Sequence, residues 1–466
     1  MYRNWLIILV VAVFIFVSFF LGKMLTTEPS LPLALAVGAL VAIITFQRPE
    51  NGLVIIVFSM MLSPEIIVAQ LPKRAVTIRV DDILIIVVFL AWLAHTAVNK
   101  DWKGFVKTPL DTPLLILFFL YVFSTIIGIM TGNMNPVKGF FYAMKYIEYF
   151  ILYWMVVNIA SYDKDIPLYL ISGLVTCIIV TLFAYSLMGS AFRVYAPFDA
   201  EGGEPASLGG YYLVIYAIAF SFFLHTASRV HQLLYLGLIL FLLPPFVKTL
   251  SRASYLAFGP MLVTMLLLAK KRRMTLGLMM LVGLTAFPIL FNDLYQQMAT
   301  RVNATFTTDA HVQRDANYDM GGKKITDQSA IDRLVSWKRV LSEDLPKNGF
   351  TLLFGNGIAG IRFTEGQFFL MLAELGVVGT IVFYWLMVKI VRHSYRVYKS
   401  TSQPLHQSLC LALISCMVAL HIQSFTTNTF IIVRVMEPFW FLTGLVMNLP
   451  LEEKEATASQ LQPAAV

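Results

Sequence analysis

Long apolar runs separated by short polar connectors dominate the chain. A membrane-spanning helix needs about 17–25 mostly apolar residues, and about 14 segments approach that criterion. They lie near 5–22, 31–46, 52–68, 82–99, 110–130, 139–160, 166–188, 207–225, 232–248, 252–269, 274–291, 367–391, 406–424 and 430–449. The pattern predicts an all-α polytopic membrane protein with about 14 transmembrane helices, within a range of about 12–14. Residues 1–466 would form a single integral membrane domain.

Cationic residues in the connectors set the predicted orientation, because they favour the cytoplasmic side of a membrane. With the N-terminus in the cytoplasm, the run KKRR at 270–273 falls inside, and so does the C-terminus. Residues 451–466 then form a disordered cytoplasmic tail, and the long polar segment 292–366 faces outward. Lys248 and Arg252 are exceptions, since their connector also faces outward. We interpret them either as side chains that extend to lipid headgroups or as part of an anion site.

The amino-acid composition narrows the class of protein. The chain is 58% hydrophobic and only 13% charged, which is too little charge to cover a soluble protein of 466 residues. A net charge of +8 suits basic loops beside anionic lipid, and no basic patch interleaved with aromatic residues indicates nucleic acid. The cysteines Cys177, Cys410 and Cys416 all lie in apolar runs without metal or disulfide spacing. We therefore expect neither a metal site nor a cofactor.

The outer segment 292–366 is too long for a simple connector. Its stretch SAIDRLVSWKRVLSED predicts an amphipathic helix over 329–344 that lies on the outer membrane surface. Arg333 and Trp337 are four residues apart and share one face, whereas Lys338 and Arg339 are expected to face solvent. The following GNGIAG, at 355–360, matches a G-x-G-x-x-G pattern, but no βαβ unit surrounds it, so it predicts a tight turn.

Ionisable and polar residues gather at the outer ends of the late spans. Glu365 and Gln367 stand at the mouth of span 367–391, and His421 lies near the outer end of span 406–424. Arg434 and Glu437 are three residues apart on one face of the last span, where they either neutralise each other or face a wet cavity. A similar pair in span 139–160, interpreted as structural, is formed by Lys145 and Glu148.

Three stretches resemble the O-antigen ligase and O-antigen polymerase family of bacterial membrane glycosyltransferases. They are LSRASYLAF (250–258), DRLVSWKRVL (332–341) and FGNGIAGIRFTEGQFFLMLAELGVVG (354–379). The resemblance implies an enzyme of the bacterial cytoplasmic (inner) membrane that moves a glycan from a polyprenyl-diphosphate carrier to a saccharide acceptor at the outer face. Arg252 and Arg333 would hold the diphosphate. Ligases of the family carry a His-Asn pair where this chain has Glu365 and Gly366, which favours a polymerase or exopolysaccharide branch.

The chemistry of such a transfer assigns roles to the remaining residues. Two arginines can compensate the diphosphate charge without a nucleotide or metal, and Lys248 and Arg434 are further candidates for binding the donor. An acceptor hydroxyl needs a general base, for which Glu365 is the candidate and His421 the alternate. Residues expected to contact the acceptor or to support the site are Gln367, Trp337 and Glu437. A single displacement at the anomeric carbon would invert its configuration.

Other functions stay open at this point. An O-antigen ligase would transfer the glycan to a lipid A-core or another final acceptor. A lipid-linked oligosaccharide flippase or another transporter would perform no chemistry, and a scaffold in an envelope-synthesis complex would have no need of outward arginines. Expected partners are a polyprenyl-diphosphate-linked oligosaccharide, a saccharide acceptor, membrane lipid and other polysaccharide-assembly proteins, with no nucleic acid.

Overall fold

The computed structural model describes residues 30–71, 74–100, 106–160, 165–199, 204–303, 318–320, 323–325, 328–347, 349–362 and 364–449. The predicted first span, 5–22, and the predicted tail, 451–466, lie outside these residues. The described chain is helical apart from two antiparallel hairpins. One pairs β1 (Glu65–Leu71) with β2 (Arg74–Arg79), and the other pairs β3 (Tyr318–Met320) with β4 (Lys323–Ile325).

The helices follow the apolar runs of the sequence. In chain order they are α2 (Ser30–Gln47), α3 (Pro49–Leu62), α4 (Val80–Asn99), α5 (Asp111–Met130), α6 (Pro136–Ile159), α7 (Ile166–Leu187), α8 (Pro205–His225), α9 (Arg229–Lys248), α10 (Arg252–Leu268), α11 (Arg273–Leu290), α12 (Asn292–Asn303), α13 (Gln328–Arg339), α14 (Gly349–Phe354), α15 (Gln367–Ser400), α16 (Pro404–Ser424) and α17 (Val433–Met447). Within the described ranges, nine of them are long and apolar enough to cross a membrane: α4 to α9, α11, α15 and α16. Shorter apolar helices are α2, α3 and α10. The chain therefore has the helices of a polytopic membrane protein, and the number of 14 spans stays a prediction.

Two predicted spans take a different form. The run 52–68 does not continue as one helix, because α3 ends at Leu62 and the chain enters β1. The last run, 430–449, becomes a 3₁₀ turn, Thr429–Ile431, followed by the 15-residue helix α17. At 1.5 Å per residue α17 is about 22 Å long, short of the ~30 Å hydrocarbon core. Nearly all of its residues are buried, so α17 is an inner helix of the bundle.

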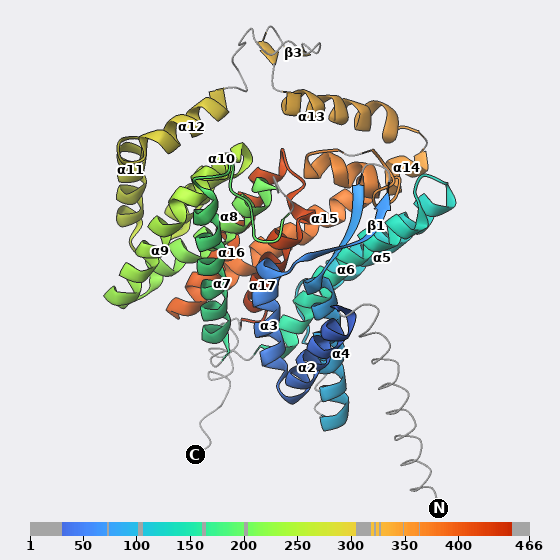
Figure 1. Ribbon diagram of the computed structural model, residues 1–466, viewed down its shortest axis with the longest axis horizontal. Helices are drawn as coiled ribbons and strands as arrows, with labels where there is room; N and C mark the ends of the chain where they lie inside the picture. The colour runs from blue at the N-terminus through green and yellow to red at the C-terminus, as the bar shows by residue number, and fades with distance from the viewer. Residues whose placement is uncertain are drawn as a thin grey trace, which may run out of the picture.

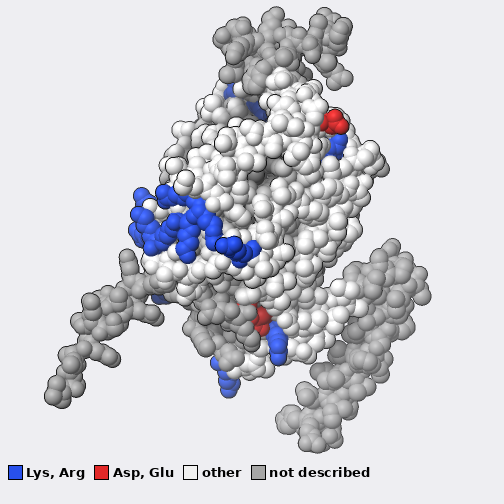
Figure 2. All heavy atoms as spheres, turned by 90° about the vertical axis from the view of Figure 1, so that its left-hand side faces the viewer, with Lys and Arg blue, Asp and Glu red and all other residues white. Residues whose placement is uncertain are grey.

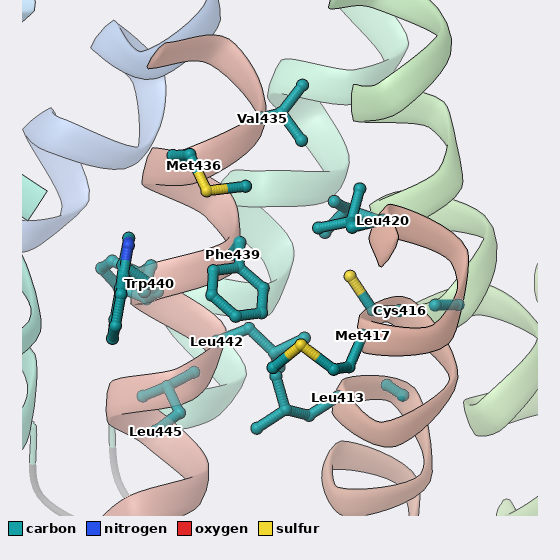
Figure 3. Close-up of a cluster of buried hydrophobic side chains, with 14 of the residues drawn as sticks. Leu413, Cys416, Met417, Leu420, Val435, Met436, Phe439, Trp440, Leu442 and Leu445 are labelled. Atoms are coloured by element: carbon teal, nitrogen blue, oxygen red, sulfur yellow. The ribbon is translucent and has the colours of Figure 1, made fainter. Parts of the chain in front are cut away.

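The core forms around α8, α16 and α17. Helix α16 packs against α8, α10 and α15, and α17 packs against α6 and α8. Figure 3 shows how α16 and α17 meet: Cys416, Met417 and Leu420 of one helix face Phe439 and Leu442 of the other. Helices that are buried on nearly all sides and mostly apolar are typical of the interior of a large helical protein.

The outer helices expose apolar side chains. Phe119, Leu234 and Leu284 are each more than half exposed, as expected for helices that contact lipid acyl chains. Figure 2 shows a surface that is mostly uncharged, with one dense group of lysines and arginines. Among the described residues, exposed cations stand at the start of α9 (Arg229) and between α10 and α11 (Lys270 and Lys271).

Helices α12 and α13 lie across one end of the bundle (Figure 1). Beneath α13, helix α15 is broken at Gly376, whose φ of 69° and ψ of −170° are not helical. A Cβ at this position would lie 2.4 Å from the carbonyl oxygen of Leu353, so glycine permits α14 to approach the break closely. This arrangement places the N-terminal end of α15, which we call its mouth, under α13, the helix of the outer loop.

Candidate functional site

The loop helix α13 is tied to the mouth of α15 by an ion pair. Arg333 Nε donates to Glu365 Oε2 at 2.5 Å. The side chains of Arg333 and Glu365 are 20% and 35% exposed, so both remain accessible to a ligand. Two residues that the sequence assigned to donor binding and to base catalysis are thus in direct contact.

Trp337 fixes the same junction through a different atom. Its indole Nε1 donates to the main-chain oxygen of Glu365 at 2.5 Å, and its ring stacks on Phe369, with centroids 4.7 Å apart. Gly366 has φ of 98°, and a Cβ there would lie 3.0 Å from the indole nitrogen. The junction therefore needs a glycine after Glu365, and the shared face of Arg333 and Trp337 is the face that contacts α15.

The expectation that Arg339 faces solvent is wrong. Arg339 Nη2 donates to the main-chain oxygen of Arg362 at 3.1 Å and to Thr364 Oγ1 at 2.9 Å, and its Nε pairs with Asp344 at 3.2 Å. A π-helical turn, Val340–Asp344, follows α13 and brings Asp344 back toward Arg339. Lys338 is exposed, as expected. Arg339 thus helps to hold the loop segment that leads to Glu365.

Gln367 and Asn428 join the mouth of α15 to the turn before α17. Gln367 Oε1 accepts from the main-chain nitrogen of Phe430 at 3.1 Å, and Asn428 Nδ2 donates to the Thr364 oxygen at 2.8 Å. Both side chains are buried. Gln367 therefore supports the site from inside, and contact with an acceptor is not indicated by its position.

The GNGIAG segment forms the predicted tight turn and packs on the break in α15. Main-chain nitrogens of Asn356 and Gly357 donate to the Ala373 and Glu374 oxygens, at 2.9 and 3.1 Å, which the break leaves without helical partners. A Cβ on Gly355, at φ 77°, would lie 2.2 Å from the Glu374 oxygen. The glycines are required by this close approach.

A second polar group lies where α8, α10 and α17 begin. Buried Gln423 of α16 donates to the Ala206 oxygen of α8 and to Ser254 Oγ of α10, both at 3.0 Å. Ser251 caps α10 by accepting from the Ser254 nitrogen, and half-buried Arg252 is the first residue of that helix. Because helix N-termini carry partial positive charge, the adjacent first turns of α8 and α10 favour an anion near Arg252.

The two other cations predicted to bind the donor already have protein partners. Lys248 Nζ donates to Gln297 Oε1 of α12 at 2.9 Å. Arg434, 2% exposed, pairs through Nη1 with Asp199 Oδ1 at 2.8 Å. The sequence offered Glu437 as a partner of Arg434. In the structure Glu437 instead lies near Asp81 and Glu148.

His421, the alternate base, points into the bundle. Its Nδ1 lies 2.8 Å from the Met417 oxygen, and its ring contacts those of Phe430 and Tyr384, with centroids 5.0 and 6.0 Å away. Among the described residues, no hydrogen bond joins His421 to Glu365. Glu365 is thus the better placed of the two candidates.

An apolar cavity of about 160 Å³ opens between α3, α7, α8, α9 and α17. Its walls include Met60, Leu174, Ile215 and Pro438. Pro438 follows Arg434 by four residues, so this part of the cavity wall lies about one helical turn along α17 from Arg434. This volume is similar to a ~150 Å³ apolar cavity that accommodates benzene, and it suits a short segment of a hydrocarbon chain.

The described residues contain no group of three or more His, Cys, Asp or Glu side chains arranged to hold a metal ion. The contacts made by Asp199, Asn428 and Gln423 were not predicted, and only the polar character of Gln423 within an apolar run could have indicated one of them. No family model and no curated protein sequence matches the chain.

Proposed function

We propose that the protein is a membrane glycosyltransferase of the polysaccharide polymerase type. It moves a glycan from a polyprenyl-diphosphate carrier to a saccharide acceptor at the outer face of a bacterial cytoplasmic membrane, with inversion and without a nucleotide. The observation that carries the proposal is the contact of Arg333 and Trp337 with Glu365. This contact brings together, at the N-terminal end of α15, a cation suited to binding a diphosphate and a carboxylate suited to general base catalysis.

Arg333 is suited to the donor because its guanidinium can bind two phosphate oxygens at once. In the structure its Nε is occupied by Glu365. A diphosphate would compete for Arg333, and its arrival would free Glu365 Oε2 to accept a proton from the acceptor hydroxyl. Charge compensation of the leaving diphosphate is strongest where water is excluded, so a bound donor that covered this partly exposed pair would strengthen it.

The carrier lipid would extend from the cations into the apolar cavity. Arg252, at the start of α10, and Arg434, if a phosphate displaced Asp199 from it, are candidates for the phosphates. Lys248 is better suited to anchoring α12 through Gln297. In this arrangement two exposed apolar residues, Val335 of α13 and Leu341 of the π-helical turn after it, would face the membrane surface.

The experiment is an assay of purified protein with a polyprenyl-diphosphate-linked oligosaccharide, with and without a second saccharide acceptor. Extension of the lipid-linked glycan by further repeats supports a polymerase. Transfer only to the added acceptor indicates a ligase and corrects the proposal in that respect. Intact donor in both arms, under conditions in which the protein binds it, contradicts the proposed reaction and favours a transporter.

A further inference from the structure

A second group of charged side chains, outside the candidate site, is buried where β2, α4 and α6 meet. The guanidinium of Arg79 donates to both oxygens of Asp81 at 2.7–3.0 Å and to the Met60 oxygen at 3.0 Å. Lys145 binds Asp82 at 2.9 Å, not Glu148 as the sequence suggested. These two ion pairs compensate two cations with two carboxylates.

Two further carboxyl groups face these pairs, and neither forms an ion pair of its own among the described residues. Glu148 is 7% exposed and Glu437 of α17 is fully buried. Both oxygens of Glu437 and Oε1 of Glu148 are buried and have no hydrogen-bond partner among the described atoms. Glu437 interacts electrostatically with Asp81 and Glu148. If all four carboxyl groups were ionised, two negative charges would remain uncompensated in the interior.

Protons are the simplest ligands that remove these charges. A buried carboxylate without a partner is so unfavourable that it takes up a proton instead. Glu148 also lies within hydrogen-bonding reach of Asp82, and two carboxyl groups can share a hydrogen bond only when one is protonated. No described group of three acidic, His or Cys side chains could hold a metal ion here.

We propose that Glu437 and the Asp82–Glu148 pair form a buried proton-binding site that holds two protons at neutral pH. One proton sits on Glu437, and the other is shared between Asp82 and Glu148. Charged and titratable groups face the site from three places. The β2–α4 junction contributes Arg79, Asp81 and Asp82, and α6 contributes Lys145, Glu148 and Tyr149. Arg434, which pairs with Asp199, lies about one turn from Glu437 on α17. The proposal does not rest on the glycosyltransferase function.

The protonation state of Glu437 is linked to the structure of the first turn of α17. Tyr149, which interacts with Glu437, donates its hydroxyl to the Ile431 oxygen at 3.3 Å. Ile431 lies just before α17, and Arg434 precedes Glu437 by three residues. Ionisation of Glu437 would place an uncompensated charge in this helix and loosen the segment that carries Arg434.

Infrared spectroscopy of purified protein at neutral pH tests the site directly. Ordinary Asp and Glu side chains are ionised there, so the carbonyl stretch of protonated carboxyl groups reports buried carboxyl groups that keep a proton. We expect this band in the wild type, a clear loss of intensity in Glu437→Gln, and a further loss when Glu148→Gln is added. Glu343→Gln, at an exposed carboxylate, is the matched control and leaves the band unchanged.

Thermal stability against pH gives a second, independent readout. A carboxyl group that keeps its proton when folded and loses it when unfolded makes stability fall as pH rises above the ordinary carboxyl range. Glu437→Gln, which cannot ionise, should match the wild type in acid and exceed its melting temperature in alkali. Absence of the band in wild-type protein overturns the proposal even if no variant folds. A band unaffected by Glu437→Gln, or stability that follows sodium concentration instead of pH, also overturns it.

Discussion

Replacement of Glu365 by Gln separates catalysis from positioning at the mouth of α15. The change removes the negative charge but keeps the size of the side chain. It also keeps the main-chain oxygen that accepts from Trp337 and the stacking of Trp337 on Phe369. The local structure should therefore survive, and only the ion pair to Arg333 is lost.

The expected magnitudes for stability and rate differ widely. The ion pair is partly exposed, at 20% and 35% for its two side chains, and such pairs contribute about 0–1 kcal/mol to stability. A general base contributes roughly 10²–10⁴-fold to turnover, equivalent to about 2.7–5.4 kcal/mol of activation free energy. Glu365→Gln should thus melt within a few degrees of the wild type while its turnover at saturating donor and acceptor falls by that factor.

The assay measures saturating turnover, donor affinity and melting temperature on the same preparations. Glu343→Gln, an exposed carboxylate beyond the same loop helix, is the matched control and should be silent in all three. Turnover of Glu365→Gln within about threefold of the wild type, far short of a general base's contribution, would refute the reasoning. Glu365 would then serve only to orient Arg333.

Further predictions address the loop, the turn and the orientation. Arg339→Ala should lower activity through loss of its bonds to the Thr364 region, whereas Lys338→Ala, at an exposed neighbour, should be silent; equal effects of the two would contradict this. Gly355→Ala should lower the melting temperature, because the new Cβ would lie 2.2 Å from the Glu374 carbonyl oxygen. The φ of 77° at Gly355 is also left-handed, which alone costs a residue other than glycine roughly 1–2 kcal/mol. An unchanged melting temperature would exclude this packing. Cysteine introduced at Ser342 should react with an impermeant thiol reagent in intact spheroplasts, and cysteine at Lys271 should not. Background labelling should be low because the three native cysteines are buried. The reverse labelling pattern would invert the proposed topology.

The helical pattern and the shared face of Arg333 and Trp337 were predictable, because both depend on spacing along one helix. Residues four apart lie one above the other, and the contact of both side chains with Glu365 follows that geometry. The contacts of Arg339 could not be predicted from that spacing. The π-helical turn after α13 breaks the 3.6-residue periodicity, and the loop that contacts Arg339 lies more than twenty residues later in the chain.

Long-range charge pairing could not be read from the sequence. Arg434 and Glu437 are neighbours on α17, yet Arg434 pairs with Asp199, which lies 235 residues earlier. Hydropathy likewise cannot distinguish a lipid-facing span from a buried helix, since both are apolar. Only the packing of α17 among α6, α8 and α16 shows that it belongs to the interior.

The most direct test of the central claim is the release of polyprenyl diphosphate from a lipid-linked oligosaccharide by protein reconstituted in liposomes. Wild-type protein should release one polyprenyl diphosphate for each glycosidic bond formed. Arg252→Ala and Arg333→Ala should each remove most of this release, and Lys at either position should restore it only in part, because Lys lacks the planar guanidinium. Movement of intact donor between leaflets with no release of polyprenyl diphosphate would contradict the account and identify a transporter.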